Sequence, residues 1–406
     1  MILVLYTTKY RLGGAEMERA AIQMAARLGG QAVRIESKRE FLKAIAEGPI
    51  QELHFVGHSG LYGPMFGTTA FPEQMSRAEW AALDIPFAPG AQAYFHCCRS
   101  ARWFAPYFAR RYGVVTHGHR SYTTFSSDPT VYRPLGGGAV HVVSVPGFKG
   151  MGIFGAAKKR LGKGRVLPMD RFEPVADEDR GYDDVAELYD AVFEDFRVRE
   201  DEWRWISARI PEGAKVLDIG CGNGAVLAAL ASLIESGVGV DTSLPMLQRA
   251  ERRAEANLRF AQIDGPIVPL EDASVDIVLC VLAWRYLDWD PMVAEIKRVL
   301  RPGGRLLLID MVVSPFQPKA AGKVLSDKIR TTFAALGKPR FRRALRDLVD
   351  DPRWRTMLRH HPMRAQHEYR NYLPSRFPGV KTFVLNRAVR SEILAFEWTA
   401  TVPQVN

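Results

Sequence analysis

The chain has 406 residues, which is long for one compact domain and natural for two, and 47% of them are hydrophobic, enough to bury two cores. The net charge of +10 comes with plentiful acidic residues, so we interpret the excess as a solvated surface and do not expect nucleic acid as a partner. No run approaches about 18 apolar residues, which excludes a membrane-spanning helix. The first residues lack a signal-peptide pattern, so we expect a cytoplasmic protein.

Strands and helices alternate through the first half of the chain. Apolar runs predict strands at 2–6, 32–35, 50–56, 91–95 and 113–116. Between them, apolar residues at helical spacing predict helices, and Ser37 with Glu40 forms an S-x-x-E pattern that caps one of them. Such alternation predicts an α/β fold with a parallel sheet and ligands at the carboxyl ends of its strands.

The four cysteines show neither a disulfide framework nor metal-ligand spacing, so we expect no metal site. Two of them, Cys97 and Cys98, directly follow a predicted strand, and His58 follows the neighbouring one. A thiol before a helix start meets unsatisfied N–H groups, which lower its pKa, and a nearby histidine can deprotonate it. The open alternative is a buried small cysteine with a structural histidine. His117 and His119 follow the fifth strand, and we interpret them as polar loop residues.

The segments LHFVGHSG and AYFHCCRSA resemble the caspase-like fold of caspases, metacaspases and bacterial CHAT domains over about residues 1–145. The resemblance implies that His58 is the base and that Cys98, rather than Cys97, is the nucleophile. Metacaspases carry an acidic residue two positions before the cysteine, where this chain has His96. That departure argues against cleavage after basic residues and leaves open whether the domain is a peptidase at all.

A glycine-rich and then basic stretch separates the two halves. From Pro134 it reads PLGGGAVHVVSVPGFKGMGIFGAAKKRLGKGR, with a strand predicted at 140–145. We therefore expect a caspase-like domain at 1–150, a linker at 151–180 and a second domain at 181–406.

The second half is organised around VLDIGCGNG, a strand that runs into a glycine turn and then a helix. The turn contains Asp218 in a D-x-G-x-G-x-G pattern, which leaves room for a flat cofactor against the backbone but lacks the G-x-x-G ending of a dinucleotide loop. An acid inside the loop suits a cationic amino-acid tail better than a pyrophosphate. These residues resemble motif I of class I S-adenosylmethionine (SAM)-dependent methyltransferases of the small-molecule type.

Later landmarks follow the order of that family: Asp241 after the next strand, Asp264 after the third, then 274–280 and RPGGRLLLID. The resemblance implies a Rossmann-like domain with SAM as cofactor, ribose hydroxyls on Asp241, the adenine amino group at Asp264, and a leading helix with Tyr182 and Tyr189 over the cofactor. The expected cofactor-binding residues are Asp218, Gly220, Cys221, Gly222, Gly224, Asp241, Thr242, Asp264, Gly265, Val281 and Tyr189.

A helical, basic insertion at about 316–378 precedes two final strands, 380–385 and 392–398, which we expect to pair antiparallel. In this family such an insertion commonly caps the substrate pocket. Its arginines are either solvent-facing or a site for an anionic acceptor. His367 is the expected catalytic base, with His361 and Asp310 as alternatives, and a base is needed only for a protonated acceptor.

The Asp/Asn-Pro-Pro-aromatic signature of many amino-group methyltransferases is missing after Asp276, which favours an oxygen, carbon or sulfur acceptor. We expect a methyltransferase for a small-molecule or peptide acceptor, whose caspase-like half recruits a protein partner or processes a peptide. The alternative is a signalling protein with a caspase-like effector half and a half that only senses SAM.

Overall fold

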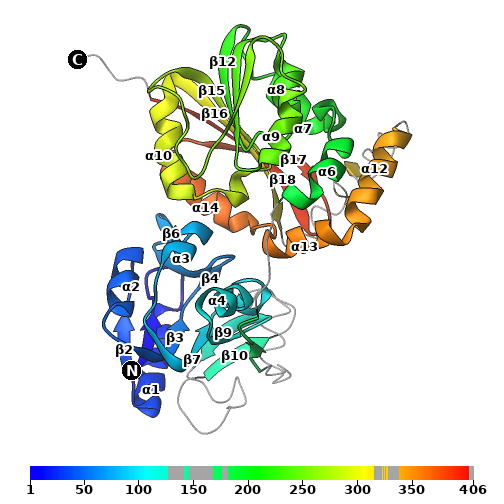
Figure 1. Cartoon of the computed structure of the whole chain (residues 1–406). Helices are drawn as coiled ribbons and strands as arrows, with labels where there is room; N and C mark the ends of the chain where they lie inside the picture. Colours follow the sequence, from blue (N-terminus) through cyan, green and yellow to red (C-terminus); the bar gives the residue numbers. More distant parts are fainter. Residues whose placement is uncertain are drawn as a thin grey trace, which may run out of the picture. The chain divides into compact units, whose positions relative to one another are not determined.

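The computed structural model describes residues 1–126, 141–145, 168–175, 182–314, 322, 324, 326–327 and 338–401. The chain forms two compact units, Met1–Glu178 and Asp179–Asn406, which are described separately (Figure 1).

The first unit is built on a six-stranded sheet with the order β11-β8-β7-β3-β1-β2. Its strands are β1 (Ile2–Tyr6), β2 (Gln31–Arg34), β3 (Ile50–Val56), β7 (Phe87–His96), β8 (Val115–Gly118) and β11 (Asp170–Phe172). The first five pair in parallel and β11 is antiparallel to β8. The prediction of an α/β unit with a parallel sheet is therefore confirmed.

Helices cover both faces of this sheet. They are α1 (Gly14–Leu28), α2 (Lys38–Ile45), α3 (Arg77–Ala82) and α4 (Phe104–Tyr112), with a 3₁₀ turn η1 (Ser100–Arg102) before α4. On one face Met17 and Ala21 of α1 pack against Val4. On the other, the aromatic residues Trp80 and Phe108 join the main core.

Short strands that the sequence analysis did not predict fill the connections. They are β4 (Ser59–Gly60), β5 (Gly63–Gly67) and β6 (Pro72–Gln74), which follow β3, and β9 (Tyr122–Ser126), which pairs with β10 (His141–Val145). The predicted linker also differs, because β11 lies inside it and belongs to the first sheet. Positions 151–167 and 176–180 of that linker lie outside the described residues.

In the described part of the first unit, α2 and α3 begin with capping serine side chains, and only α3 has a complete capping box. Ser37 accepts a hydrogen bond from Glu40 N, but the Glu40 carboxylate accepts from Glu36 N rather than from Ser37 N. The complete box is at α3, where Ser76 and Glu79 cap each other's backbone. Each cap satisfies an N–H that the helix itself leaves without a partner.

The second unit contains a seven-stranded sheet with the order β14-β13-β12-β15-β16-β18-β17. Its strands are β12 (Ala214–Ile219), β13 (Ile234–Asp241), β14 (Leu258–Gln262), β15 (Val275–Val281), β16 (Leu300–Val313), β17 (Lys381–Arg387) and β18 (Ser391–Thr399). The first five are parallel, and β18 is antiparallel to both of its neighbours. The predicted final antiparallel pair is therefore confirmed.

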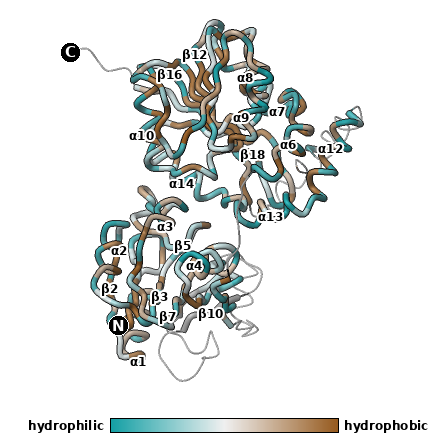
Figure 2. Tube along the Cα trace, viewed as in Figure 1, coloured by the Kyte–Doolittle hydropathy of each residue, from teal (hydrophilic) through white to brown (hydrophobic). Residues whose placement is uncertain are grey.

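Helices pack on both faces of this sheet as well. They are α7 (Glu200–Ser207), α8 (Ala225–Leu230), α9 (Leu244–Glu251), α10 (Trp289–Val299) and α14 (Gln366–Arg376). Ile206 of α7 and Leu227 of α8 share a core with one face, whereas Ile296 of α10 and Leu373 of α14 share a core with the other. Figure 2 shows the strands near the β12 label in brown, as expected for strands buried on both faces.

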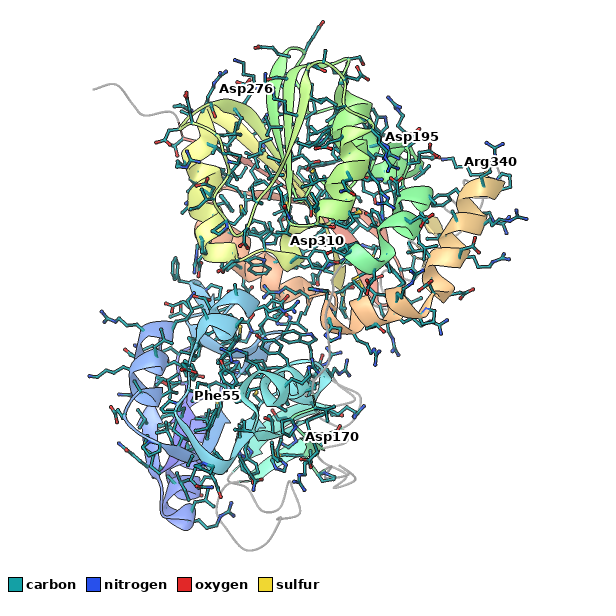
Figure 3. The ribbon with its side chains drawn as sticks, in the orientation of Figure 1. Phe55, Asp170, Asp195, Asp276, Asp310 and Arg340 are labelled. Carbon is teal, nitrogen blue, oxygen red and sulfur yellow. The ribbon has the colours of Figure 1, made fainter. Side chains whose placement is uncertain are left out.

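The segment before β12 and the cap after β16 contact each other. The predicted single leading helix is divided into η2 (Asp183–Val185), α6 (Ala186–Val192) and η3 (Phe196–Val198). The cap is described from 338 onward and contains α12 (Pro339–Asp350) and α13 (Pro352–His360). Leu348 of α12 packs with Val192 of α6, while the arginines of α12 face outward, as Arg340 shows at the outer end of that helix (Figure 3).

Candidate functional site

The turn after β12 is shaped by three glycines with left-handed backbone conformations. Gly220, Gly222 and Gly224 have φ values of 72°, 53° and 72°. A Cβ on Gly220 would stand 2.3 Å from the Cβ of Ala283, in the turn that follows β15. The loop therefore needs glycine for conformation and for space, and it brings the ends of β12 and β15 together.

Asp218, in the same strand-to-loop segment, is a buried acid. It is 1% exposed, and neither carboxylate oxygen has a hydrogen-bond partner among the described residues. Burial, with a smaller contribution from Asp241, raises the pKa of Asp218 to about 7. Because a buried polar group without a partner is costly, this side chain fits a cationic ligand group that the loop would bring to it.

Asp241 ends β13 and is held in place by backbone N–H groups. Gly222 N donates to its Oδ2 at 2.8 Å, and Ser243 N donates to its Oδ1 at 2.9 Å. Burial raises the pKa of Asp241, and these backbone hydrogen bonds oppose that shift. The carboxylate is thus fixed beside the glycine loop, at the carboxyl end of β13.

The other expected cofactor residues lie around the same sheet edge. Thr242 and Asp264 are exposed just beyond β13 and β14, and Gly265 has a φ of 101° with open space around its Cα. Val281 ends β15 and is half-buried. Cys221 is buried inside the loop, and burial raises the pKa of its thiol.

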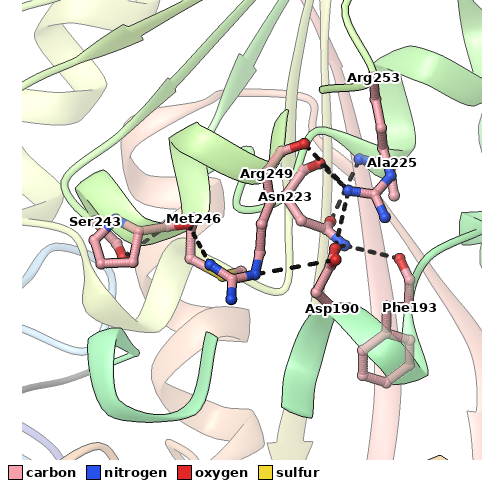
Figure 4. A network of polar contacts seen from close by, with 9 residues as sticks. Asp190, Phe193, Asn223, Ala225, Ser243, Met246, Arg249 and Arg253 are labelled. Atoms are coloured by element: carbon pink, nitrogen blue, oxygen red, sulfur yellow. Dashed lines mark hydrogen bonds and ion pairs between the residues drawn. The ribbon is translucent and has the colours of Figure 1, made fainter. Parts of the chain in front are cut away.

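A polar network joins the leading segment to this loop (Figure 4). Asp190 of α6 accepts from Asn223 Nδ2 at 2.8 Å and forms an ion pair with Arg253 at 2.9 Å. Asn223 Nδ2 also donates to the Phe193 carbonyl at 2.9 Å. A second link is the Ser243 hydroxyl, which donates to Asp183 at 2.6 Å. These contacts hold the leading segment against the cofactor loop.

Tyrosine side chains connect the leading segment to the cap. The rings of Tyr182 and Tyr189 meet edge to face at 5.4 Å, and the Tyr182 and Tyr286 hydroxyls are 2.9 Å apart. Burial raises the pKa of Tyr189 to about 12, so its hydroxyl stays neutral. The Tyr286 ring also meets the His361 ring at 5.1 Å.

Asp310 does not suit the role of base that the sequence analysis allowed. It is completely buried, and it accepts hydrogen bonds from Arg285 N at 3.0 Å, Met311 N at 2.7 Å and the Tyr369 hydroxyl at 2.6 Å. Figure 3 shows it among the inner side chains. Its oxygens are occupied by protein donors, so we correct that expectation and interpret Asp310 as structural.

The histidines of the cap differ in their surroundings. His361 follows α13 and lies against Tyr286. His367 lies in the first turn of α14, two residues before the tyrosine that donates to Asp310. His361 therefore has the direct contact with the cofactor-side tyrosines, although His367 was the expected base.

In the first unit, His58 and Cys98 lie beyond the carboxyl ends of the adjacent strands β3 and β7. The Ser59 hydroxyl donates to the Cys98 carbonyl at 2.6 Å, which ties the two segments together. His58 Nε2 contacts the Leu12 carbonyl at 3.0 Å, and burial lowers the pKa of His58. A carbonyl only accepts, so Nε2 carries the proton and Nδ1 has a free lone pair.

The two adjacent cysteines have different environments. Cys98 is half-buried, and Thr123 N donates to its sulfur at 3.3 Å. The backbone donor thus comes from β9 and not from the helix that follows. Cys97 is completely buried, and burial raises the pKa of its thiol to about 12. Of the pair, Cys98 is the more exposed thiol.

Other histidines form a layer on the same sheet. Tyr94 stacks on His54 at 4.5 Å and on His117 at 4.4 Å, with His117 inside β8. His96 and His54 share a 3.1 Å contact. His119 is 4% exposed, with no hydrogen-bond partner for its ring among the described residues. The interpretation as polar loop residues is therefore wrong for His117, which lies in β8, whereas His119 lies in a loop but is buried.

In the part of the chain that the structure describes, no helix is long and apolar enough to cross a membrane. The same residues contain no group of three or more histidine, cysteine or acidic side chains able to hold a metal ion.

Comparisons with known proteins concern the second unit. Residues 217–308 match the family model described as a methyltransferase domain. The chain is 34% identical over 113 residues to demethylmenaquinone methyltransferase of Thermus thermophilus, covering 26% of this chain and 50% of that protein. It is 30% identical over 160 residues to 27-O-demethylrifamycin SV methyltransferase of Amycolatopsis mediterranei, covering 34% and 58%. A solved SAM-dependent methyltransferase from Aquifex aeolicus aligns with a TM-score of 0.34 and 16% identity over 52% of this chain and 93% of its own.

The chain spans about half the length of these curated relatives. The matched segment begins one residue before Asp218 and contains the glycine loop, Asp241 and Asp264. Residues 217–308 of the second unit therefore resemble a methyltransferase domain, and the cofactor indicated for that domain is S-adenosyl-L-methionine.

Proposed function

We propose that this protein transfers a methyl group from S-adenosyl-L-methionine to an oxygen, carbon or sulfur atom of a small-molecule or peptide acceptor. The observation that carries the proposal is Asp218, a buried carboxylate without a hydrogen-bond partner among the described residues, beside a glycine loop. Such an acid favours a cationic ligand group, and the methionine part of the cofactor has an ammonium. The family match over 217–308 supports the same conclusion.

The cofactor supplies a methyl group on a sulfonium, which is already activated for in-line displacement. The contribution of the protein is therefore mostly positioning. In this proposal Asp218 holds the ammonium, Asp241 receives the ribose hydroxyls and Asp264 receives the adenine amino group. The fixed orientation of Asp241 between two backbone N–H groups supports its role. Tyr189 and the polar network of Asp190 keep the leading segment over the ligand.

For an acceptor that arrives protonated, we propose His361 as the general base ahead of His367. Its contact with Tyr286 supports this choice, because Tyr286 follows the turn that touches Gly220. An imidazole in its neutral form can accept a proton from an acceptor bound there.

Calorimetric titration of the full-length protein with S-adenosyl-L-methionine and S-adenosylhomocysteine tests the cofactor site. We expect both to bind, and we expect Asp218→Asn to weaken binding at least tenfold, because a hydrogen bond to a charged group is worth about 1.5–3 kcal/mol. The matched control is Asp272→Asn, whose side chain is 80% exposed and pairs with Arg298.

The control should bind both ligands as the unmodified protein does. Equal affinity in Asp218→Asn, Asp241→Asn and the control would rule out this site. Methylated product from labelled cofactor, detected by mass spectrometry of incubated metabolites and peptides, then separates an enzyme from a protein that only senses the cofactor.

A second function is favoured by a separate observation in the first unit. We propose Cys98 as a nucleophile and His58 as its base, in a caspase-like domain that recruits or processes a peptide. The Leu12 carbonyl fixes the Nε2–H tautomer of His58, which leaves Nδ1 as a base, and Thr123 N donates to the Cys98 sulfur. A Cys/His pair needs a neutral imidazole within reach of the thiol, and the hydrogen bond from Ser59 to the Cys98 carbonyl supports the proposal by joining the two segments.

A further inference from the structure

A cluster of aromatic and cationic side chains lies beyond the carboxyl end of β15, and it includes Tyr182, which the sequence analysis placed over the cofactor. Tyr182 comes from the leading segment, Arg285 and Tyr286 from η4 (Trp284–Tyr286), and His361 and Trp354 from the cap. The Tyr182 ring is 5.5 Å from Tyr286 and 6.2 Å from Trp354. Three segments far apart in the sequence therefore converge on one place.

The cluster adjoins the cofactor loop. Ala283, which precedes η4, occupies the space that a side chain on Gly220 would need. Tyr189, which contacts Tyr182, lies close enough to both Asp241 and Arg285 for each of them to shift its pKa. A group bound at the cluster would thus lie next to a ligand of the glycine loop.

The positive charge of Arg285 is directed toward this cluster. Its guanidinium Nη1 forms an ion pair with Asp310 Oδ1 at 3.7 Å, and the guanidinium also makes side-chain hydrogen bonds with Tyr182 and Tyr286. The guanidinium carbon is 4.8 Å from the centre of the Tyr286 ring. Arg285 also acts on the hydroxyls of Tyr182 and Tyr286, lowering the pKa of each against the larger effect of burial.

The hydroxyls of Tyr182 and Tyr286 add neutral hydrogen-bond donors beside the Arg285 guanidinium. They are 2.9 Å apart, so one donates to the other and the second proton of the pair is available for a further acceptor. Burial keeps both phenols neutral by raising their pKa values. A buried guanidinium beside neutral O–H donors stabilises an anionic oxygen, and the surrounding half-buried rings favour a flat molecule.

Resting on the proposed function, we propose that the methyl acceptor is a planar molecule with an acidic oxygen, bound as its oxyanion by Arg285 and the Tyr182–Tyr286 hydroxyl pair. The proton of the acceptor hydroxyl passes to a ring nitrogen of His361, so a neutral acid and a neutral imidazole become an oxyanion and an imidazolium. His361 later releases that proton to water. An acceptor that is already ionised needs no such transfer.

The test is binding of 4-nitrophenol to the full-length protein saturated with S-adenosylhomocysteine, followed through the visible absorbance of the phenolate. We expect the bound probe to ionise at lower pH than the free probe, and the neutral 4-nitroanisole to bind at least tenfold more weakly. Arg285→Met should weaken 4-nitrophenol binding tenfold or more, because it removes a charged hydrogen-bond donor. Titration with 4-nitrobenzoate distinguishes a carboxylate from a phenolate as the preferred oxyanion.

Arg301→Met is the control, since Arg301 pairs with Asp276 near the start of β15, away from its carboxyl end. Tyr286→Phe removes only a hydroxyl and should weaken the probe severalfold, which keeps the test informative if Arg285→Met folds poorly. Equal binding of probe and anisole, or unchanged probe affinity in both variants, overturns the inference. Calorimetry with S-adenosylhomocysteine alone separates the outcomes, because its failure in the unmodified protein removes the proposed function itself.

Discussion

The two units place polar residues at the same position, the carboxyl edge of a parallel sheet, and satisfy them differently. In the first unit His58 contacts the Leu12 carbonyl and the Cys98 sulfur accepts from Thr123 N. In the second, Asp218 is buried with no such partner among the described residues. His58 and Cys98 thus have partners within the protein, whereas Asp218 has none among the described residues. A motif at the end of a strand therefore predicts the position of a candidate site. A buried polar group without a hydrogen-bond partner indicates where a ligand would bind.

The largest expected change in stability comes from adding a side chain to the glycine loop. Gly220→Ala should destabilise the second unit by about 2–5 kcal/mol, from left-handed backbone strain together with overpacking against Ala283. Gly213→Ala is the matched control, because Gly213 has the same φ of 72° but open space around it. Urea denaturation should show a cost about 1–3 kcal/mol smaller for the control, and equal costs would mean that the loop is not tightly packed.

The ionisation of Asp218 should make the ligand-free second unit less stable as pH rises. Its pKa is about 7 when folded and lower when unfolded, so the folded state binds more protons between about pH 4 and 7. Stability is thus full below about pH 4 and decreases by up to roughly 4 kcal/mol as pH passes through 7. Urea denaturation across this range measures the slope, with the second-unit transition identified by its shift with S-adenosylhomocysteine.

Asp218→Asn should flatten that pH dependence, and Asp272→Asn should leave it unchanged. In the unmodified protein the cofactor should also bind more weakly below pH 7, by up to tenfold per pH unit, because the ionised carboxylate is the form that receives a cation. A pH-independent affinity would mean that Asp218 does not meet the ammonium.

The network in Figure 4 should contribute less, since it acts through the leading segment. Asp190→Ala removes the partner of Asn223 and Arg253 and should raise the dissociation constant of S-adenosylhomocysteine about tenfold. Asp195→Ala is the control, because Asp195 is exposed, caps η3 and forms an ion pair with Arg197. Calorimetry on both variants checks this, and equal constants would show that the segment does not cover the ligand.

The last prediction concerns the reactivity of the two adjacent cysteines in the first unit. Iodoacetamide near neutral pH should alkylate Cys98 at least tenfold faster than the buried Cys97, as measured by mass spectrometry of the peptides. His58→Ala should slow the Cys98 reaction, whereas His117→Ala, which alters a histidine held by Gln92, should not. Equal, slow labelling of both cysteines would indicate an inert domain.

The sequence was sufficient where function depends on local spacing. Asp218, the glycines and Asp241 lie within 24 consecutive residues, and the loop and strand ends place them together. The role proposed for Arg285 and Tyr286 was not predicted from the sequence, because both residues lie in an irregular turn. Tyr286 also depends on a contact with Tyr182, which lies 104 residues earlier. No local pattern carries that information.

The single leading helix implied by the family resemblance is divided in the structure, although Val185, Val192 and Phe196 along it are all buried. The Phe193 carbonyl, however, accepts from Asn223 Nδ2 of the glycine loop, and the helix ends there. A tertiary hydrogen bond thus replaced a helical one. By contrast, the capping box of Ser76 and Glu79 was visible in the sequence as S-x-x-E and was overlooked.

The three residues of β11 have a practical consequence for anyone producing the first unit alone. β11 closes the outer side of β8 through paired backbone groups, and Arg120 donates to Asp170 at 2.7 Å. A fragment truncated at position 150 would lose that strand and leave β8 as an open edge, which invites self-association. A soluble N-terminal fragment should therefore extend beyond Phe172, and its monodispersity in size-exclusion chromatography would show the benefit.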